Sequence, residues 1–461
     1  MKKLDTKWKI VLFGCGGLGV NMLGIIVSSY LCSALLTGGF APEDIGLWTY
    51  SNQNLVISAI WSVLVVVAKV LDGIIDLPLA SLTDNLRTRW GRRRPAILMG
   101  FAPMLAAYLL FLIPATPGTE SLANTIWFAV LLCVFYSAYT LTMVSYYATF
   151  SEVTSSARDR MLLSTVKSVC DVVYFIFGFA LLPVFVGMGI NIRFVALMFL
   201  PLAATVLIPL LLIKEPSTEN GIPDAEDAPS PERVGLFASI AYAFKHRAFI
   251  YWLFVLFVMN CGSQIFLSGI NEFFSVTQIN MTFVMASAFV PVPFTLILFN
   301  KINKRFGFRI GYQYVLLTFA LGMALMGLLV WLCPPVAEGS SPPLWFVLGA
   351  MGCGVIVSFA IGAFFSVSYT IPSQLAAEEN KKGIVCASSM FFAVQGLFEG
   401  VSAGIATGPI LVFLKETQNT QWTTIVVAGL CMIAFVMAFF LPKSVANIGK
   451  EEASAPAEKP L

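Results

Sequence analysis

Long apolar segments dominate this chain, and short polar segments separate them. A helix needs about 20 mostly apolar residues to cross the hydrocarbon core of a bilayer, so each such segment predicts one membrane-spanning helix. Several segments are longer than that, which predicts tilted helices or helix ends that project beyond the bilayer. The pattern predicts twelve spans, at about residues 10–36, 46–81, 95–114, 124–150, 161–188, 192–213, 247–275, 280–302, 309–332, 343–374, 383–414 and 421–441.

The longest polar segment lies midway along the chain. Residues 214–235, KEPSTENGIPDAEDAPSPERVG, combine Pro, Ser, Asp and Glu with few apolar residues, as linkers do. This segment divides the predicted spans six and six. We therefore predict an all-α membrane protein with an N-terminal six-helix bundle at 1–213, a cytoplasmic linker at 214–246, a C-terminal six-helix bundle at 247–441 and a disordered tail at 442–461.

The composition supports a membrane protein and argues against several other classes. The chain is 58% hydrophobic and 11% charged, with a mean hydropathy of +0.84, whereas a soluble domain carries about 25% charged residues. Its basic residues form short clusters between apolar segments, so we expect no nucleic-acid partner. The nine cysteines include no CxxC pair, which argues against a zinc site or a disulfide framework.

The distribution of Lys and Arg predicts the orientation in the membrane. With the N-terminus in the cytoplasm, the predicted cytoplasmic segments hold 24 of the 28 basic residues, and the outer loops hold two. Cytoplasmic loops carry such an excess of positive charge. We expect a multi-pass protein of the plasma or inner membrane with both termini in the cytoplasm.

The two halves of the chain resemble each other. TDNLRTRWGRRRP follows the second predicted span and NKINKRFGFRIGY follows the eighth, which occupies the same place in its half. Parallel repeats of six spans, with a substrate site near the midplane between them, are the plan of the major facilitator superfamily. The chain resembles that plan, which implies two six-helix bundles around a central cavity.

Three charges interrupt the second apolar segment. Lys69, Asp72 and Asp76 are three and four positions apart, so they share one face of a helix. A charge at membrane depth costs about 2.5–3.5 kcal/mol on insertion scales, so such residues are usually functional. Two carboxylates one turn apart need a cation or a proton between them. The spacing predicts a coupling-ion site, and the alternative is a structural ion pair of Lys69 with Asp72 or Asp76.

The segment KVLDGIIDLPLASLTDNLRTRWGRRRP resembles the signature of the glycoside–pentoside–hexuronide:cation symporters, the melibiose permease-like family of the superfamily. Two positions depart from the family pattern, because Leu77 replaces a Pro and Ala80 replaces a Gly. The resemblance extends through FGCGGLGVN, SARDR and IPSQLAAEENKKG and covers nearly all of 8–441. The residues on the pattern are Lys69, Asp72, Asp76, Asp84, Gly91, Arg92, Arg94 and Pro95.

The resemblance implies a role for each matching position. Asp72 and Asp76 would hold Na⁺, Li⁺ or H⁺ together with Thr140 of the fourth span, and Lys69 would be their charge partner. Hard cations prefer such oxygen ligands. The basic turn would form a cytoplasmic gate between helices, or it would only anchor the chain by its positive charge. The gate residues are Asp84, Arg87, Arg92 and Arg94.

The substrate positions depart from the family. Its sugar-binding aspartates correspond to Asn21 and Met143, and its lysine on the eleventh span corresponds to Gln395. Tyr147 matches an aromatic position of the fourth span. These neutral residues predict a substrate that is less polar or differently hydroxylated than the sugars of the family.

Further polar residues are candidates for the cavity wall. Lys167 lies near a basic family position, and the alternative is an internal ion pair with Asp171, four residues on. Glu399 shares a helix face with Gln395, which predicts contact with substrate or with a proton. Gln264 lies on the seventh span and is a further candidate.

The chain shows no catalytic set, so we expect a transporter that needs no cofactor beyond its coupling ion, Na⁺ or H⁺. GCGGLG at 14–19 follows no strand, and its glycines predict close helix packing instead of a nucleotide site. We predict a monomeric cation-coupled symporter of a sugar, glycoside or related small solute. Two alternatives stay open, a cation-dependent carrier of lysolipids or other amphiphiles and a non-transporting receptor or scaffold.

Overall fold

Twelve helices in the described part of the chain are long and apolar enough to cross a membrane, which confirms the predicted number. The computed structural model describes residues 4, 6–37, 55–84, 86–116, 120–153, 157–218, 244–277, 279, 281–333, 342–381 and 388–446, and every regular element in them is helical. The side chains of Asp76 and Asp84 lie outside this description, as do residues 219–243 of the predicted linker and 447–461 of the predicted tail.

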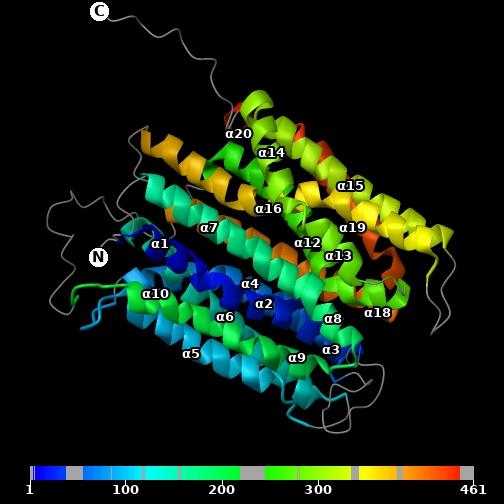
Figure 1. Ribbon diagram of the computed structural model, residues 1–461, viewed down its shortest axis with the longest axis horizontal. Coiled ribbons are helices and arrows are strands. Elements are labelled where there is room, and N and C mark those ends of the chain that lie inside the picture. Colours follow the sequence, from blue (N-terminus) through cyan, green and yellow to red (C-terminus); the bar gives the residue numbers. More distant parts are fainter. Residues whose placement is uncertain are drawn as a thin grey trace, which may run out of the picture. The chain divides into compact units, whose positions relative to one another are not determined.

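The first six spans differ in regularity. Three are broken by 3-10 or π turns, and the others are long continuous helices (Figure 1). α4 continues through Pro78 to its end. The elements are α1 (Lys7–Gly14), η1 (Cys15–Gly17), α2 (Leu18–Ile25), η2 (Ile26–Leu31), α3 (Cys32–Thr37), α4 (Ser58–Asp84), α5 (Arg93–Phe111), α6 (Leu122–Val153), α7 (Ala157–Ile176), η3 (Phe177–Leu181), α8 (Leu182–Gly187), α9 (Ile192–Phe199), η4 (Leu200–Val206) and α10 (Leu207–Leu212).

The last six spans begin at α12. Their elements are α12 (Arg247–Thr277), α13 (Met281–Phe289), α14 (Val292–Phe306), α15 (Phe308–Leu332), α16 (Leu344–Lys381), α17 (Ser388–Ile405), η6 (Ala406–Ile410), α18 (Leu411–Glu416), η7 (Thr420–Trp422) and α19 (Thr423–Ala438), followed by α20 (Lys443–Ala446).

Contacts divide the chain into two compact units. The first unit contains residues 1–230, 264–286 and 400–423, and the second contains 231–263, 287–399 and 424–461. The first unit therefore combines the helices of the N-terminal half with two later segments. Residues 264–286 contain parts of α12 and α13, and residues 400–423 run from the end of α17 to the start of α19. The division into bundles at 1–213 and 247–441 stays a prediction from the sequence.

Glycine allows the first span to pack closely on its neighbours. A Cβ atom at Gly19 would overlap the backbone carbonyl of Leu202 in η4. A Cβ atom at Gly14 would lie 2.7 Å from Cγ1 of Val166 in α7. Small residues permit such backbone approach between membrane helices, so the structure confirms close packing at the GCGGLG segment.

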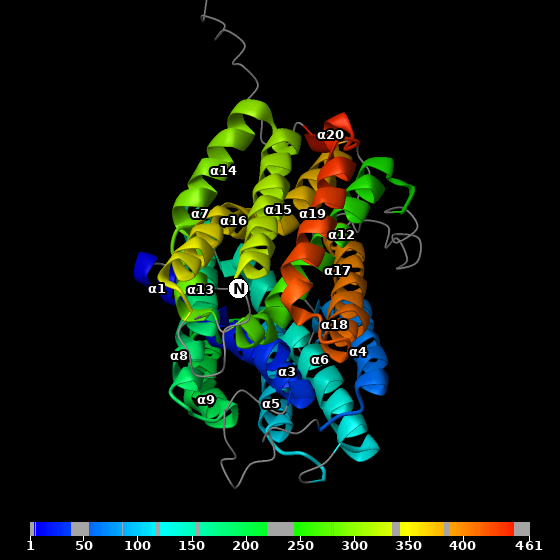
Figure 2. The ribbon, with the colours of Figure 1, turned by 90° about the vertical axis from the view of Figure 1, so that its right-hand side faces the viewer.

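A second close approach, within the first unit, joins α4 to the end of the eleventh span (Figure 2). Gly400, Gly404 and Gly408 recur every four residues and form one stripe toward α4. A Cβ atom at Gly400 would lie 2.5 Å from the carbonyl oxygen of Lys69, and one at Gly404 would lie 3.0 Å from Cα of Val66. The glycine stripe therefore packs against the backbone of the helix that carries Lys69.

Candidate functional site

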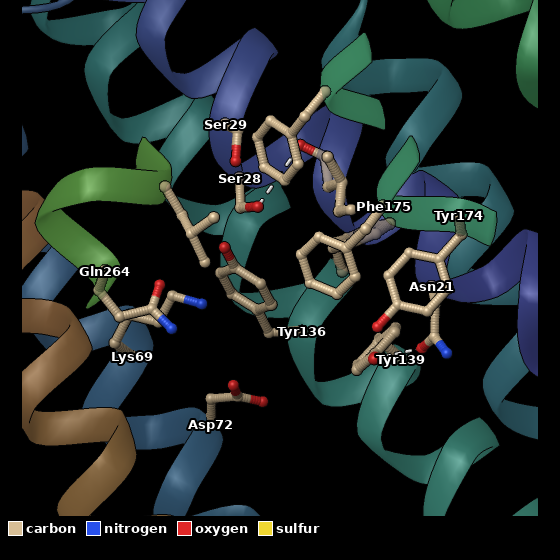
Figure 3. Close-up of a pocket in the computed structure, with 15 residues that line it drawn as sticks. Asn21, Ser28, Ser29, Lys69, Asp72, Tyr136, Tyr139, Tyr174, Phe175 and Gln264 are labelled. Carbon is tan, nitrogen blue, oxygen red and sulfur yellow. Dashed lines mark hydrogen bonds between the residues drawn. The ribbon is translucent and has the colours of Figure 1, made fainter. Parts of the chain in front are cut away.

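A cavity of about 250 Å³ lies within the first unit (Figure 3). Its walls come from the first, second, fourth and fifth spans and from the part of α12 that belongs to this unit. Its polar and charged wall residues are Asn21, Ser28, Ser29, Lys69, Asp72 and Gln264. Its aromatic wall residues are Phe135, Tyr136, Tyr139, Tyr174, Phe175 and Phe179. The structure thus places four residues predicted for the site or the cavity wall on one cavity: Asn21, Lys69, Asp72 and Gln264.

Asp72 and Thr140 meet across this cavity wall. Asp72 projects from α4 and Thr140 from α6, and the Thr140 hydroxyl donates a hydrogen bond to Oδ1 of Asp72 at 3.0 Å. This pairing places two oxygen ligands of the kind that hard cations prefer within reach of one ion. Their proximity agrees with what the family resemblance implies, and their cation-binding role stays a prediction. The second predicted carboxylate, Asp76, lies one turn further along α4, and its side chain is outside the described part.

Lys69 has an aromatic partner. Its Nζ atom lies 3.6 Å from the centroid of the Tyr136 ring, over the ring face. Between the described side chains of Lys69 and Asp72 the structure forms no ion pair within 4 Å, although they are three residues apart. A cation over an aromatic face is stabilised by about 0.5–2 kcal/mol, more when it is desolvated. A direct ion pair of Lys69 with Asp72 is therefore not formed, although their charges interact. The alternative pair with Asp76 lies outside the described side chains.

Asn21 also has an aromatic partner on the fourth span. The Tyr139 hydroxyl donates to Oδ1 of Asn21 at 2.7 Å, so the amide is held at the wall (Figure 3). Phe135 stacks on Tyr139 with 6.4 Å between ring centroids. Phe135 and Tyr139 were not among the site residues predicted from the sequence. Their spacing in FYSAY, where Phe135 and Tyr139 are four residues apart, is the signal that would have identified them.

Three residues predicted to bind substrate do not line this cavity. Met143 is buried, and its methyl group would lie 3.0 Å from a Cβ atom at Gly17 in the first span. Lys167 forms an ion pair with Asp171, with 2.6 Å between Nζ and Oδ2. Its Nζ atom lies 5.5 Å from the centroid of the Tyr147 ring. The structure therefore shows the internal ion pair that was the alternative for Lys167, and the substrate roles of these residues stay predictions.

Gln395 and Glu399 lie together in the second unit. Nε2 of Gln395 donates to Oε1 of Glu399 at 2.9 Å, as expected for residues four apart on one helix face. Oε1 of Gln395 accepts from the Trp252 indole at 3.0 Å, and Asn260 donates to the Glu399 carbonyl oxygen at 3.0 Å. The first two bonds hold the Gln395 side chain between Glu399 and Trp252, and the third joins α12 to the backbone of α17. Contact of Gln395 and Glu399 with substrate stays a prediction.

The basic turn between α4 and α5 is held by the segment that follows the sixth span. Oε2 of Glu215 accepts a hydrogen bond from the Arg93 backbone N–H at 2.9 Å. Gly91 adopts φ +85°, a left-handed conformation suited to glycine. A Cβ atom there would overlap the Glu215 side chain. The start of the predicted linker therefore holds the turn in place through Glu215, and we call this contact a clamp. The sequence did not predict it.

Thr218 completes this clamp. Its hydroxyl accepts from the Thr88 N–H at 3.1 Å, and its own N–H donates to the Thr88 carbonyl at 3.0 Å. The predicted gate residue Arg87 is exposed, and Arg92 and Arg94 are partly exposed. The fourth predicted gate residue, Asp84, has its side chain outside the described part. The gating role of these residues stays a prediction.

Comparison with known proteins identifies the family. The family of MFS/sugar transport proteins matches residues 12–442. A lactose permease from Lactobacillus helveticus is 28% identical over 180 residues, which are 38% of this chain and 26% of the permease. The matched region thus spans about a quarter of that relative's length.

Solved transporters share the fold. The nucleoside transporter NupG superposes with a TM-score of 0.63 at 13% identity, over 95% of this chain and 100% of that one. A bacterial homolog of the human lysosomal transporter Spinster, inward-facing and unoccupied, has a TM-score of 0.57 at 13% identity, over 98% and 100%. A POT family transporter in complex with a thioalcohol-conjugated peptide has a TM-score of 0.60 at 13% identity, over 94% and 96%. At this identity the likeness concerns the fold alone.

The residues matched by the family and the residues of the twelve helices cover nearly the same part of the chain. The match extends from the first span to the end of the twelfth. The family and the fold are those of a multi-pass membrane transporter rather than of an enzyme. The chain belongs to the family of MFS/sugar transport proteins of the major facilitator superfamily.

Proposed function

We propose that this protein is a cation-coupled symporter of a sugar, glycoside or related small solute. The observation that carries the proposal is the Asp72 carboxylate, hydrogen-bonded to Thr140 at the wall of a cavity that also bears amide, hydroxyl and aromatic groups. In this proposal the protein works as a monomer in the cell membrane, with both termini in the cytoplasm.

The electrostatics of the cavity support coupling to a cation. The Lys69 ammonium group lies over the Tyr136 ring and forms no direct ion pair with Asp72, so the carboxylate oxygens are not bound to it, although the two charges still attract each other. An ionised carboxylate at membrane depth is costly unless it is paired. Na⁺ or H⁺ bound at Asp72, Asp76 and Thr140 would neutralise that charge. If cation and substrate each bind better when the other is present, their binding free energies are coupled and the two are carried together.

The wall chemistry supports a sugar-like substrate. A sugar ring presents apolar C–H faces and hydroxyl edges, so it fits a wall in which aromatic faces alternate with amides and hydroxyls. Tyr139 and Asn21 are the first such pair, and Gln264 lies on the α12 part of the same wall. The similarity to a lactose permease agrees with this substrate class.

The substrate class is tested first by ligand stabilisation. Purified protein is heated with mono- and disaccharides, glycosides, glucuronides or lysophosphatidylcholine, each with and without Na⁺ and at two pH values. A ligand that binds only the folded state raises the Tm. We expect a sugar or glycoside to raise it, and to raise it further when Na⁺ or a lower pH supplies the cation. Stabilisation by the lysolipid alone would support the amphiphile carrier instead, and no ligand effect would support the receptor or scaffold.

The coupling role is tested with Asp72→Asn in proteoliposomes. We expect the variant to lose gradient-driven accumulation of the stabilising sugar by at least tenfold, because its amide cannot neutralise a cation, which corresponds to about 1.4 kcal/mol of lost coupling. Exchange of labelled for unlabelled sugar should persist. Glu416→Gln, an exposed position at the end of α18, is the matched control and should accumulate like wild type. Accumulation by Asp72→Asn at the wild-type level would refute the coupling role.

A further inference from the structure

Two cysteine thiols meet between the first and fifth spans, away from the cavity wall. Cys15 is the first residue of η1 and Cys170 lies in α7, and their Sγ atoms are 3.5 Å apart. Both belong to the first unit. The proposed transport function uses neither thiol.

The first span and α7 approach each other closely at this point. Gly14 precedes Cys15, and a Cβ atom there would lie 2.7 Å from Cγ1 of Val166, one turn before Cys170. A disulfide needs Sγ atoms about 2.05 Å apart and Cα atoms about 4.4–6.8 Å apart. Bond formation would bring the sulfurs about 1.5 Å closer than their present 3.5 Å separation.

We propose that Cys15 and Cys170 are an oxidation site, and that a peroxide converts them to a reversible disulfide. Cys15 is the more exposed of the two, so its sulfur attacks the peroxide, the O–O bond breaks, a sulfenic acid forms, and the second peroxide oxygen leaves with the thiol proton as one water. The Cys170 thiol then attacks the Cys15 sulfur and gives up its proton, the S–S bond forms, the S–O bond breaks, and the sulfenic hydroxyl leaves with that proton as a second water. Two thiols thereby lose two electrons and two protons, and one peroxide is reduced to two waters.

The link would restrain a break in the first span. η1 is a 3-10 turn between α1 and α2, and such turns within a helix often mark hinges. Gly16 and Gly17 follow Cys15, and the wall residue Asn21 lies in the α2 segment just beyond. A disulfide to α7 fixes this hinge to a neighbouring helix. The sulfurs lie toward the end of the span that is cytoplasmic in the proposed orientation, where thiols are normally reduced and disulfides are transient.

The test uses the full chain in lipid nanodiscs and needs no transport substrate. Protein is treated with hydrogen peroxide, remaining thiols are alkylated, and the digest is analysed by mass spectrometry. We expect a linked peptide containing Cys15 and Cys170, a loss of two titratable thiols per chain, a rise of several degrees in Tm, and reversal of all three by dithiothreitol.

Three variants make the result decisive. Cys15→Ser and Cys170→Ser should each abolish the linked peptide and the rise in Tm, while Cys353→Ser, a buried cysteine of α16, should retain both. Cys15→Ala and Cys170→Ala replace any serine variant that fails to fold. Oxidation of either thiol to sulfinic acid without a linked peptide would overturn the proposal, as would equal cross-linking of other cysteine pairs. Because no sugar is present, these outcomes are independent of the proposed transport function.

Discussion

Lys69 and Asp72 are neighbours on α4, yet their side chains have different partners. The ammonium group lies over the Tyr136 ring, and the carboxylate accepts from Thr140. Both partners come from α6, four residues apart, so a single face of the fourth span contacts the two side chains while their charges still attract each other. Because Lys69 and Asp72 form no direct ion pair, the Asp72 carboxylate is available to a coupling ion in the proposed mechanism.

The contribution of the Tyr136 ring to stability can be tested with two variants of this residue. Tyr136→Leu removes the aromatic face and should lower the free energy of unfolding by about 0.5–2 kcal/mol, which is the value of a cation–π contact. Tyr136→Phe keeps the face and should stay close to wild type. Thermal unfolding in detergent compares the two variants. Equal destabilisation of both would show that the hydroxyl, and not the ring face, carries the interaction.

At the scale of elements, close helix packing positions the cavity. The glycine stripe brings the end of the eleventh span against the backbone of α4. Beyond the stripe, Nζ of Lys415 in α18 donates to Oγ of Ser33 in α3 at 3.2 Å. The first, second and eleventh spans are thus joined on one side of Lys69 within the first unit. A larger side chain at any glycine of the stripe would push the eleventh span away from α4. α4 carries Lys69 and Asp72 of the cavity wall.

A pair of matched glycine variants tests this packing. Gly408→Ala places a Cβ atom onto the carbonyl oxygen of Ser62 and should destabilise the protein by about 1–3 kcal/mol. Gly429→Ala, in α19, meets nothing within 4 Å and should stabilise by up to about 1 kcal/mol through helix propensity. The measurement is the Tm of each variant in the same detergent. Changes of the same sign would contradict the packing role of the stripe.

At the scale of the whole molecule, charge and span number together determine topology. The twelve predicted spans, which match the number found in the described part of the chain, would place both termini on the same side of the membrane. We predict that the basic residues select the cytoplasmic side, because the predicted cytoplasmic segments hold 24 of them and the outer loops two. Orientation is therefore a property of the summed charge and not of any one residue.

Reporter fusions test this orientation. Green fluorescent protein fused after Leu461 should fluoresce, because it folds in the cytoplasm. Alkaline phosphatase joined after Glu416, in the loop predicted to face outward, should be active because that enzyme needs an oxidising compartment. Fusion of the phosphatase after Phe306, in the basic turn, is the control and should be inactive. Active phosphatase at the control position would reverse the assignment.

Part of this protein could be predicted from the sequence because the relevant properties are local to the chain. Length and hydropathy of each apolar segment determined the twelve spans, and the Lys69, Asp72 and Asp76 spacing identified the charged face. The family resemblance added Thr140 as the neighbour of Asp72, which the structure bears out as a contact.

Only the tertiary structure decided which side chains meet across helices. The Tyr136 ring over Lys69, the Tyr139 bond to Asn21 and the Glu215 clamp on the basic turn join positions far apart in sequence. These contacts depend on the rotation of each helix about its own axis and on its axial position relative to the neighbouring helix. Those quantities follow from packing at contacts such as Gly19 on Leu202, and such packing is a property of two segments together. The sequence by itself determined that the chain spans a membrane and where its charges lie, and the packed helices determined what those charges touch.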